Sequence, residues 1–191
     1  KKADTLSLSN RINLKLNSKD TLSLSNRINN LSTLAVVYDY GSFYDTAKQA
    51  ASASSSATAI KFSYEGLLNN INIQSNTSGQ PTKIKVQHAG VYMVQYTLQI
   101  IKPDVGVDEM SVWIRRNGAA YANTHSNFTI SGSNIKNLLT GNYLVDLGAN
   151  DYIELYFSVK NTSSMLCGTN VQTIPSRPAT PSVQINLHKL N

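Results

Sequence analysis

Residues 84–96 read Ile-Lys-Val-Gln-His-Ala-Gly-Val-Tyr-Met-Val-Gln-Tyr, and apolar side chains continue beyond them to Ile101. In an extended strand successive side chains point to opposite faces. One face of this segment then carries Tyr92, Val94, Tyr96 and Leu98, and the other carries Val91, Met93, Gln95 and Thr97. Since both faces are largely apolar, neither suits water. We predict a strand over 90–101 with Tyr92, Val94 and Tyr96 in the subunit core and the opposite set against a neighbour.

Short strands separated by turn residues extend outward from this segment through residues 35–191. Asn117-Gly118 favours the positive φ values of a tight hairpin turn. Pro175, Pro178 and Pro181 predict an extended segment that crosses one end of the fold. Such a pattern is typical of an all-β sandwich, barrel or jelly roll. The candidate strands are 35–40, 59–62, 71–74, 83–86, 90–101, 109–116, 127–131, 135–147, 151–159 and 182–190.

The N-terminal region contains an internal repeat, because the ten residues from Asp4 to Asn13 recur unchanged from Asp20 to Asn29. Leu6, Leu8, Ile12, Leu14 and Leu16 share one parity, which is the period of a half-buried strand. A helix competes in the second copy, where Leu24, Ile28, Leu31 and Ala35 have heptad-like spacing. We predict an oligomeric stalk over 1–34, mostly β and closing into a short coiled coil near 24–34, followed by a head over 35–191.

Charge and composition exclude several classes of protein. Residues 1–34 hold six basic and two acidic side chains of a chain with net charge +6, but after Lys2 the basic residues occur singly. This spacing favours a solvated repeat surface over a nucleic-acid site, so no nucleic-acid partner is expected. No run of about 18 apolar residues occurs, so no membrane insertion is expected. With one cysteine, the chain has neither an internal disulfide nor a multi-cysteine zinc site.

The residues that could support chemistry are scattered. His88, His125 and His188 lack metal-ligand spacing, and Cys167 lies in a polar loop with no nearby histidine. The acidic loop Asp104, Asp108 and Glu109 could offer oxygen ligands to calcium, although its spacing matches no ordered cation loop. Asp151 and Glu154 have opposite parity, unlike the paired carboxylates of a glycan hydrolase. We therefore predict no catalytic residues, no metal and no organic cofactor.

Four aromatic residues, Tyr38, Tyr40, Phe43 and Tyr44, follow the repeat closely. Aromatic side chains dominate cores and interfaces, so a packed neck between stalk and head is the favoured interpretation. A platform on which sugars stack is the alternative.

Four segments in order resemble the globular heads of the tumour necrosis factor and complement-head superfamily. They are the stretch 84–96, Val112-Trp-Ile-Arg-Arg-Asn-Gly118, Leu144-Val-Asp-Leu-Gly-Ala-Asn-Asp-Tyr-Ile-Glu-Leu155, and the closing strand Pro181-Ser-Val-Gln-Ile-Asn-Leu187. The resemblance implies a jelly-roll head with threefold symmetry, its axis lined by one face of the strands that begin at Gly90 and Asp151. The residues expected at contacts between copies are Leu6, Leu8, Ile12, Leu14, Leu22, Leu24, Ile28 and Leu31 in the stalk, and Val91, Met93 and Gln95 in the head.

A second resemblance concerns the setting. The segments Gly41-Ser-Phe-Tyr44 and Thr173-Ile-Pro-Ser-Arg-Pro-Ala-Thr-Pro181 look like parts of phage and algal-virus structural proteins, and the repeat loosely resembles viral fibre shafts. The resulting hypothesis is a non-enzymatic, homotrimeric fibre, spike or decoration subunit on the extracellular surface of a virion. Its partners would be other capsid or fibre proteins and a host-surface glycan or receptor. The alternatives are a capsid vertex (penton) subunit, a secreted or bacterial surface adhesin head, and an enzyme.

Overall fold

A computed structural model describes residues 5, 7, 8, 10, 18–33 and 38–190 of the 191-residue chain. The chain divides into two compact units, Lys1–Val37 and Tyr38–Asn191, and each is considered by itself. The domain boundary predicted after residue 34 falls within 34–37, which lie outside the described residues.

The N-terminal unit contains an α-helix, α2, over Ser18–Thr33. This helix covers 24–33, where a short coiled coil is predicted, and also 18–23, where the prediction of a mainly β stalk is wrong. Leu24 and Ile28 are four residues apart, so the helix brings them to one face.

The head is built from strands alone within residues 38–190. Their bounds are β1 Tyr40–Asp45, β2 Gln49–Ala50, β3 Thr58–Ala59, β4 Tyr64–Asn69, β5 Ile71–Ser75, β6 Pro81–Val86, β7 Gly90–Lys102, β8 Val107–Arg116, β9 Ala119–Ala120, β10 Ser126–Ser131, β11 Ile135–Leu147, β12 Tyr152–Val159, β13 Met165–Leu166, β14 Gln172–Thr173, β15 Ser176–Arg177 and β16 Val183–Lys189.

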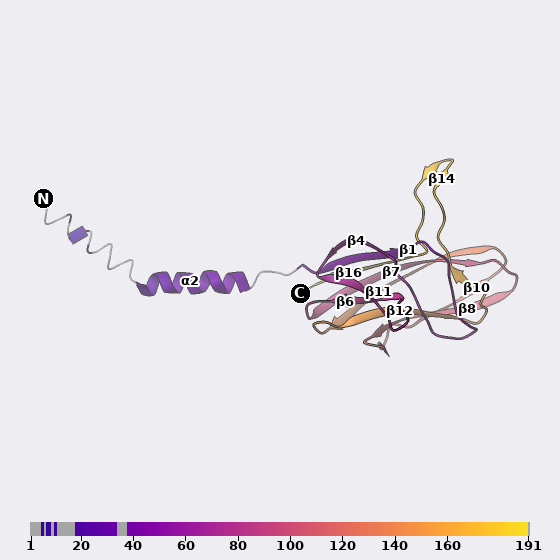
Figure 1. The fold of residues 1–191 in the computed structure, drawn as a ribbon, viewed down its shortest axis with the longest axis horizontal. Helices are drawn as coiled ribbons and strands as arrows, with labels where there is room; N and C mark the ends of the chain where they lie inside the picture. Colours follow the sequence, from indigo (N-terminus) through magenta and orange to yellow (C-terminus); the bar gives the residue numbers. More distant parts are fainter. Residues whose placement is uncertain (1–4, 6, 9, 11–17, 34–37, 191) are drawn as a thin grey trace. The chain divides into compact units, whose positions relative to one another are not determined.

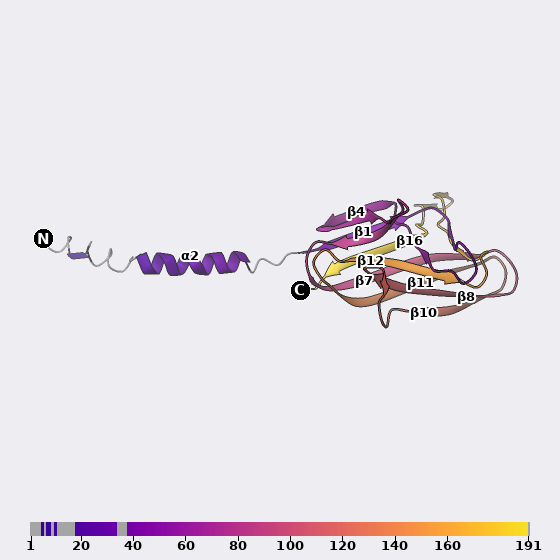
Figure 2. The ribbon, with the colours of Figure 1, turned by 60° about the horizontal axis from the view of Figure 1, so that its bottom comes forward.

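Apart from β14 and β15, which pair with each other, these strands form two antiparallel sheets that pack face to face (Figures 1 and 2). In the first, here sheet I, β7 pairs with β11 along its whole length, and β16, β1 and β4 follow on its other edge. The short strands β13 and β2 extend that edge. In the second, sheet II, the order is β10-β8-β12-β6-β5, with β3 beside β12 and β9 beside β8.

The strand pairs are nested along the chain. β8 pairs with β10, β7 with β11, β6 with β12, and β1 with β16. Such nesting arises when one long antiparallel hairpin folds over into two facing sheets, which is the double-sheet jelly roll. The predicted all-β jelly-roll head is confirmed by this strand order.

The core lies between the two sheets and follows the predicted alternation. Tyr92, Val94 and Leu98 are fully buried and Tyr96 is 2% exposed, all from β7. Phe157 of β12 is fully buried on the facing sheet. At about 25 cal/mol per Å² of apolar surface, burial of this set is the main favourable contribution to folding of the head.

Several local expectations need adjustment. The Asn117-Gly118 turn is confirmed, with φ values of 50° and 83° between the paired strands β8 and β9. Of the strand predicted over 35–40, Tyr38 and Asp39 are not in a strand and 35–37 lie outside the described residues; β1 begins at Tyr40 and contributes the buried Phe43 to the core. The proline-rich segment forms the projecting β14–β15 hairpin instead of crossing one end of the sandwich (Figure 1).

Glycine at position 141 makes room for a core aromatic ring. A Cβ built at Gly141 would lie 2.3 Å from Cζ of Tyr96, which faces it across the β7–β11 pair. We expect Gly141→Ala to lower the free energy of unfolding by about 1–3 kcal/mol, as overpacking of a core does. Gly66→Ala is the matched control, since its Cβ would lie 3.4 Å from Ser42, an ordinary contact. Urea unfolding of both variants checks this, and equal stabilities would contradict it.

Candidate oligomer interface

The outer face of sheet I carries the head residues that the sequence assigned to an interface. Val91 and Met93 are half-buried and Gln95 is exposed, while Tyr92, Val94 and Tyr96 point into the core. The predicted orientation of the two faces of β7 is therefore confirmed. Whether the outer face meets another copy is a separate question.

The strand register extends this face into rows that run across the sheet. The first row contains Tyr40, His188, Met93 and Leu144, each opposite the next on adjacent strands. Tyr40 is 41% exposed and Leu144 is 61% exposed. One end of sheet I, the end where β1 begins, thus presents large apolar side chains to the surroundings.

The second row is polar and contains both hydrogen-bond donors and acceptors. Ser42, Asn186, Gln95 and Asn142 face one another in sequence across four strands. Gln95, Asn142 and Asn186 line a hollow of about 370 Å³ on the sheet surface. Amide side chains carry both donors and acceptors, so a row of them can pair with an identical row on a second copy.

The third row contains one aromatic side chain and three polar ones. Tyr44, Gln184, Thr97 and Thr140 follow the same register. Tyr44 also stacks on Tyr64 of β4, with ring centroids 5.2 Å apart. Beyond this row Leu138 is 59% exposed on β11. The exposed apolar residues Tyr40, Leu144 and Leu138 thus lie on either side of the polar rows, as in interfaces that combine apolar and hydrogen-bonding groups.

Sequence reasoning found one strand of this surface and missed the others. The neighbours Leu144, Asn142, Asn186 and His188 come from β11 and β16, and only the cross-strand register identifies them. One expectation is wrong: the strand at Asp151 does not share the face, because β12 pairs with β8 and β6 in sheet II. Alternating apolar residues in β12 indicated a strand but not its sheet.

The structure describes some of the stalk residues that were predicted to lie at contacts between copies. Leu8, Leu22, Leu24 and Ile28 are between 56% and 62% exposed. Leu31 lies within α2. Leu6, Ile12 and Leu14 lie outside the described residues. The exposed leucines and Ile28 give the helix apolar side chains that nothing in the described part of the chain covers.

The aromatic residues at the start of the head do not form one packed neck. Phe43 points into the core and is fully buried, whereas Tyr44 points outward to Tyr64. Tyr38 is 62% exposed. Alternation along β1 separates neighbouring aromatic side chains, so the predicted cluster is wrong and Tyr40 and Tyr44 belong to the outer face of sheet I.

Buried polar contacts anchor both ends of β7. The hydroxyl of Tyr92 donates to Asp39 at 2.8 Å, and His88 Nδ1 lies 3.1 Å from the same carboxylate. Burial and the contact with Asp39 raise the pKa of the Tyr92 hydroxyl well above its usual range. At the other end the fully buried Lys102 donates to Asp104 and to the carbonyl of Gly132. These contacts give Asp39, His88 and Asp104 structural roles.

The acidic loop that could have held calcium is already engaged. Asp104 binds Lys102, the Asp108 carboxylate accepts from the backbone of Asn161, and Glu109 pairs with Lys160. Among the described residues, no group of three or more His, Cys, Asp and Glu side chains is placed to hold a metal ion. In the same part of the chain, no helix has the length and apolar character needed to span a membrane.

Comparisons with known proteins add little to this geometry. No family model matches the chain, and no curated protein matches it. Two crystal structures of murine APRIL, determined at pH 8.5 and pH 8.0, are similar with a TM-score of 0.48 each. They are 11% and 12% identical, and the alignment covers 80% of this chain and 99% of theirs. The fold assignment rests on the strand order of the chain itself.

The Lys102–Asp104 contact predicts a pH dependence of stability. The hydrogen bond from Lys102, with another from Asn161, lowers the pKa of Asp104 from 3.8 to about 2. A carboxyl group whose pKa is lower in the folded state stabilises the fold at every pH above its ordinary pKa. This stabilisation is lost as the pH falls from the ordinary pKa through the lowered pKa. We expect Asp104→Asn to lower the Tm at neutral pH, with the difference from wild type closing between pH 3.8 and about 2. A constant difference across that range would contradict this role of Asp104.

Proposed function

We propose that this chain is a subunit of a non-enzymatic, homotrimeric stalk-and-head appendage, displayed on the surface of a virus particle for attachment or capsid interaction. The observation that carries the proposal is the outer face of sheet I. Met93 and Leu144 sit there as direct neighbours on strands whose other faces form the core. Around a threefold axis the same face of three copies would meet, which would cover these apolar residues and bring the Gln95 side chains together.

The stalk supports the same arrangement. Leu24 and Ile28 of α2 are exposed, and both belong to the ten-residue segment 20–29 that repeats 4–13. A single helix with such a stripe is marginal in water, and its stability would come from packing against other helices. Assembly of three chains would cover the stripe on α2 and the outer face of sheet I in one step. This shared requirement favours a parallel oligomer over contacts between heads alone.

The threefold symmetry and the virion setting rest on sequence resemblance. The ordered segments 84–96, 112–118, 144–155 and 181–187 resemble heads of a superfamily in which trimers are usual, and 41–44 and 173–181 resemble segments of viral structural proteins. A capsid vertex subunit would use the same fold with fivefold symmetry. The oligomeric mass of the full chain distinguishes the two.

The oligomer is tested by charge substitution on opposite faces of one strand. Met93→Glu places three like charges near one axis, which costs on the order of several kcal/mol in a poorly solvated interface. We expect this variant to sediment as a folded monomer. Val94→Glu, by contrast, buries a carboxylate in the subunit core and should unfold the head. Circular dichroism separates the two results.

Val107→Glu is the matched control, because it places the same charge on a 67% exposed residue of sheet II. It should remain a trimer with the wild-type circular dichroism spectrum. A wild-type pentamer would favour the vertex subunit, and a wild-type monomer would contradict the proposal. A Met93→Glu protein that stays trimeric would place the interface elsewhere.

A further inference from the structure

The β14–β15 hairpin forms one wall of a small pocket at an end of the head. Its base is fixed by two backbone hydrogen bonds between Thr169 and Thr180, of 3.0 and 2.9 Å. Gly168 permits this close packing, since a Cβ there would lie 2.3 Å from the Thr180 carbonyl oxygen. Although the hairpin projects from the sandwich (Figure 1), the residues at its two ends bond to β7 of sheet I: the backbone N–H of Cys167 donates to the Gln99 carbonyl at 2.8 Å, and the Gln99 N–H donates to the Ser182 carbonyl at 2.9 Å.

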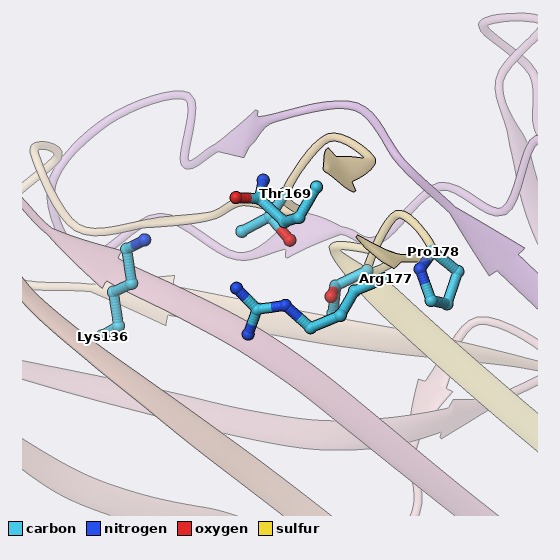
Figure 3. Close-up of a pocket in the computed structure, with 6 residues that line it drawn as sticks. Lys136, Thr169, Arg177 and Pro178 are labelled. Carbon is cyan, nitrogen blue, oxygen red and sulfur yellow. The ribbon is translucent and has the colours of Figure 1, made fainter. Parts of the chain in front are cut away.

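The pocket brings together two basic side chains from distant parts of the sequence. It has a volume of about 250 Å³ and is lined by Lys136, Thr169, Gln172, Arg177, Pro178 and Thr180. Lys136 comes from β11 of sheet I, and Arg177 comes from the hairpin. In Figure 3 the guanidinium group of Arg177 extends across the pocket toward Lys136, with Thr169 beside them.

Neither cation has an acidic partner. Two other lysines of the head do: Lys102 pairs with Asp104, and Lys160 pairs with Glu109. Among the described residues, Lys136 and Arg177 form no ion pair, and no carboxylate lines their pocket. Two like charges held at one hollow attract an anion, and a guanidinium group matches the two oxygens of a carboxylate or sulfate.

The rest of the lining is neutral and rich in hydrogen-bonding groups. Thr169, Thr180 and Gln172 offer hydroxyl and amide groups, and Pro178 offers an apolar ring. The volume lies below the roughly 300–1,000 Å³ of pockets for drug-sized ligands. These features suit one polyhydroxylated ring that carries a single acidic group.

The pocket lies at the end of sheet I away from the row at Met93. The hairpin immediately precedes β16, whose first residue, Val183, pairs with Asp45 at the end of β1. Lys136 pairs with Ile101 of β7, eight residues beyond Met93. Ligand binding at the pocket and contact between copies at Met93 therefore use different ends of the sheet.

We propose that this pocket binds the carboxylate or sulfate group of an acidic sugar unit, with Arg177 and Lys136 as the anion ligands. The inference rests on the proposed function for its biological setting, but the pocket belongs to one subunit. Its failure can be distinguished from failure of the trimer, because folded Met93→Glu protein should bind the same sugars as wild type.

Binding is tested by calorimetry with the full chain and three probes. These are a sialylated trisaccharide that carries a carboxylate, a sulfated disaccharide, and neutral lactose. We expect the lactose not to bind, and the better of the two acidic probes identifies the group recognised. Lys136→Gln and Arg177→Gln should each weaken that binding about tenfold or more, which corresponds to about 1.4 kcal/mol. Lys85→Gln, which removes an equal charge from sheet II, should bind as wild type.

The single cysteine gives a second measurement that needs no variant. Cys167 lines an adjoining hollow of about 70 Å³ together with Lys136 and Thr169. The acidic probe should therefore slow the reaction of Cys167 with a thiol reagent, and lactose should not. Equal binding of acidic and neutral probes, unchanged binding by both pocket variants, or no binding at all would overturn the proposal.

Discussion

Strand β7 imposes the constraint on which the rest of the head depends. It is hydrogen-bonded along both edges, to β11 on one side and to β16 and β13 on the other, so it lies in the middle of sheet I. One face supplies Tyr92, Val94 and Tyr96 to the core. The other face presents Val91 and Met93, which no element of the same head covers fully. Apolar side chains on both faces of an interior strand need to be covered by other parts of a protein. A single jelly roll covers only the face that points into its core.

Polar groups at the two ends of β7 hold this strand in one register. Asp39 accepts hydrogen bonds from Tyr92 and Asn70 at the beginning of the strand. Lys102 is buried at its end among oxygen atoms of Asp104 and Gly132. A slip by one residue would exchange the core and outer faces and break both sets of contacts. The outer face of sheet I and the pocket at Lys136 therefore depend on the same register.

Sequence patterns predicted the head well where one strand's own alternation decides the structure. The bounds of β11 match the prediction, and Asn117-Gly118 forms the expected turn. Prediction failed where the structure of a segment depends on the segments that pack or pair with it. The second copy of the repeat is helical, because the four-residue spacing of Leu24 and Ile28 suits one face of a helix. The alternation of apolar and polar residues, which predicted a strand, does not decide the structure there. The sheet of β12, the amide row at Gln95 and the pocket at Arg177 depend on cross-strand register and loop docking, which no local pattern encodes.

The central claim is that the outer face of sheet I is covered by other copies of the chain, and methionine oxidation tests it in the native protein. Met110 is fully buried in the core and serves as the internal reference, whereas Met93 is half-buried within a single head. The measurement is the rate of sulfoxide formation at each site in dilute peroxide, followed by peptide mass spectrometry. The account predicts that Met93 is as protected as Met110 in the assembled protein. Oxidation of Met93 at the rate of the unfolded chain, while circular dichroism shows the sandwich intact, would contradict it.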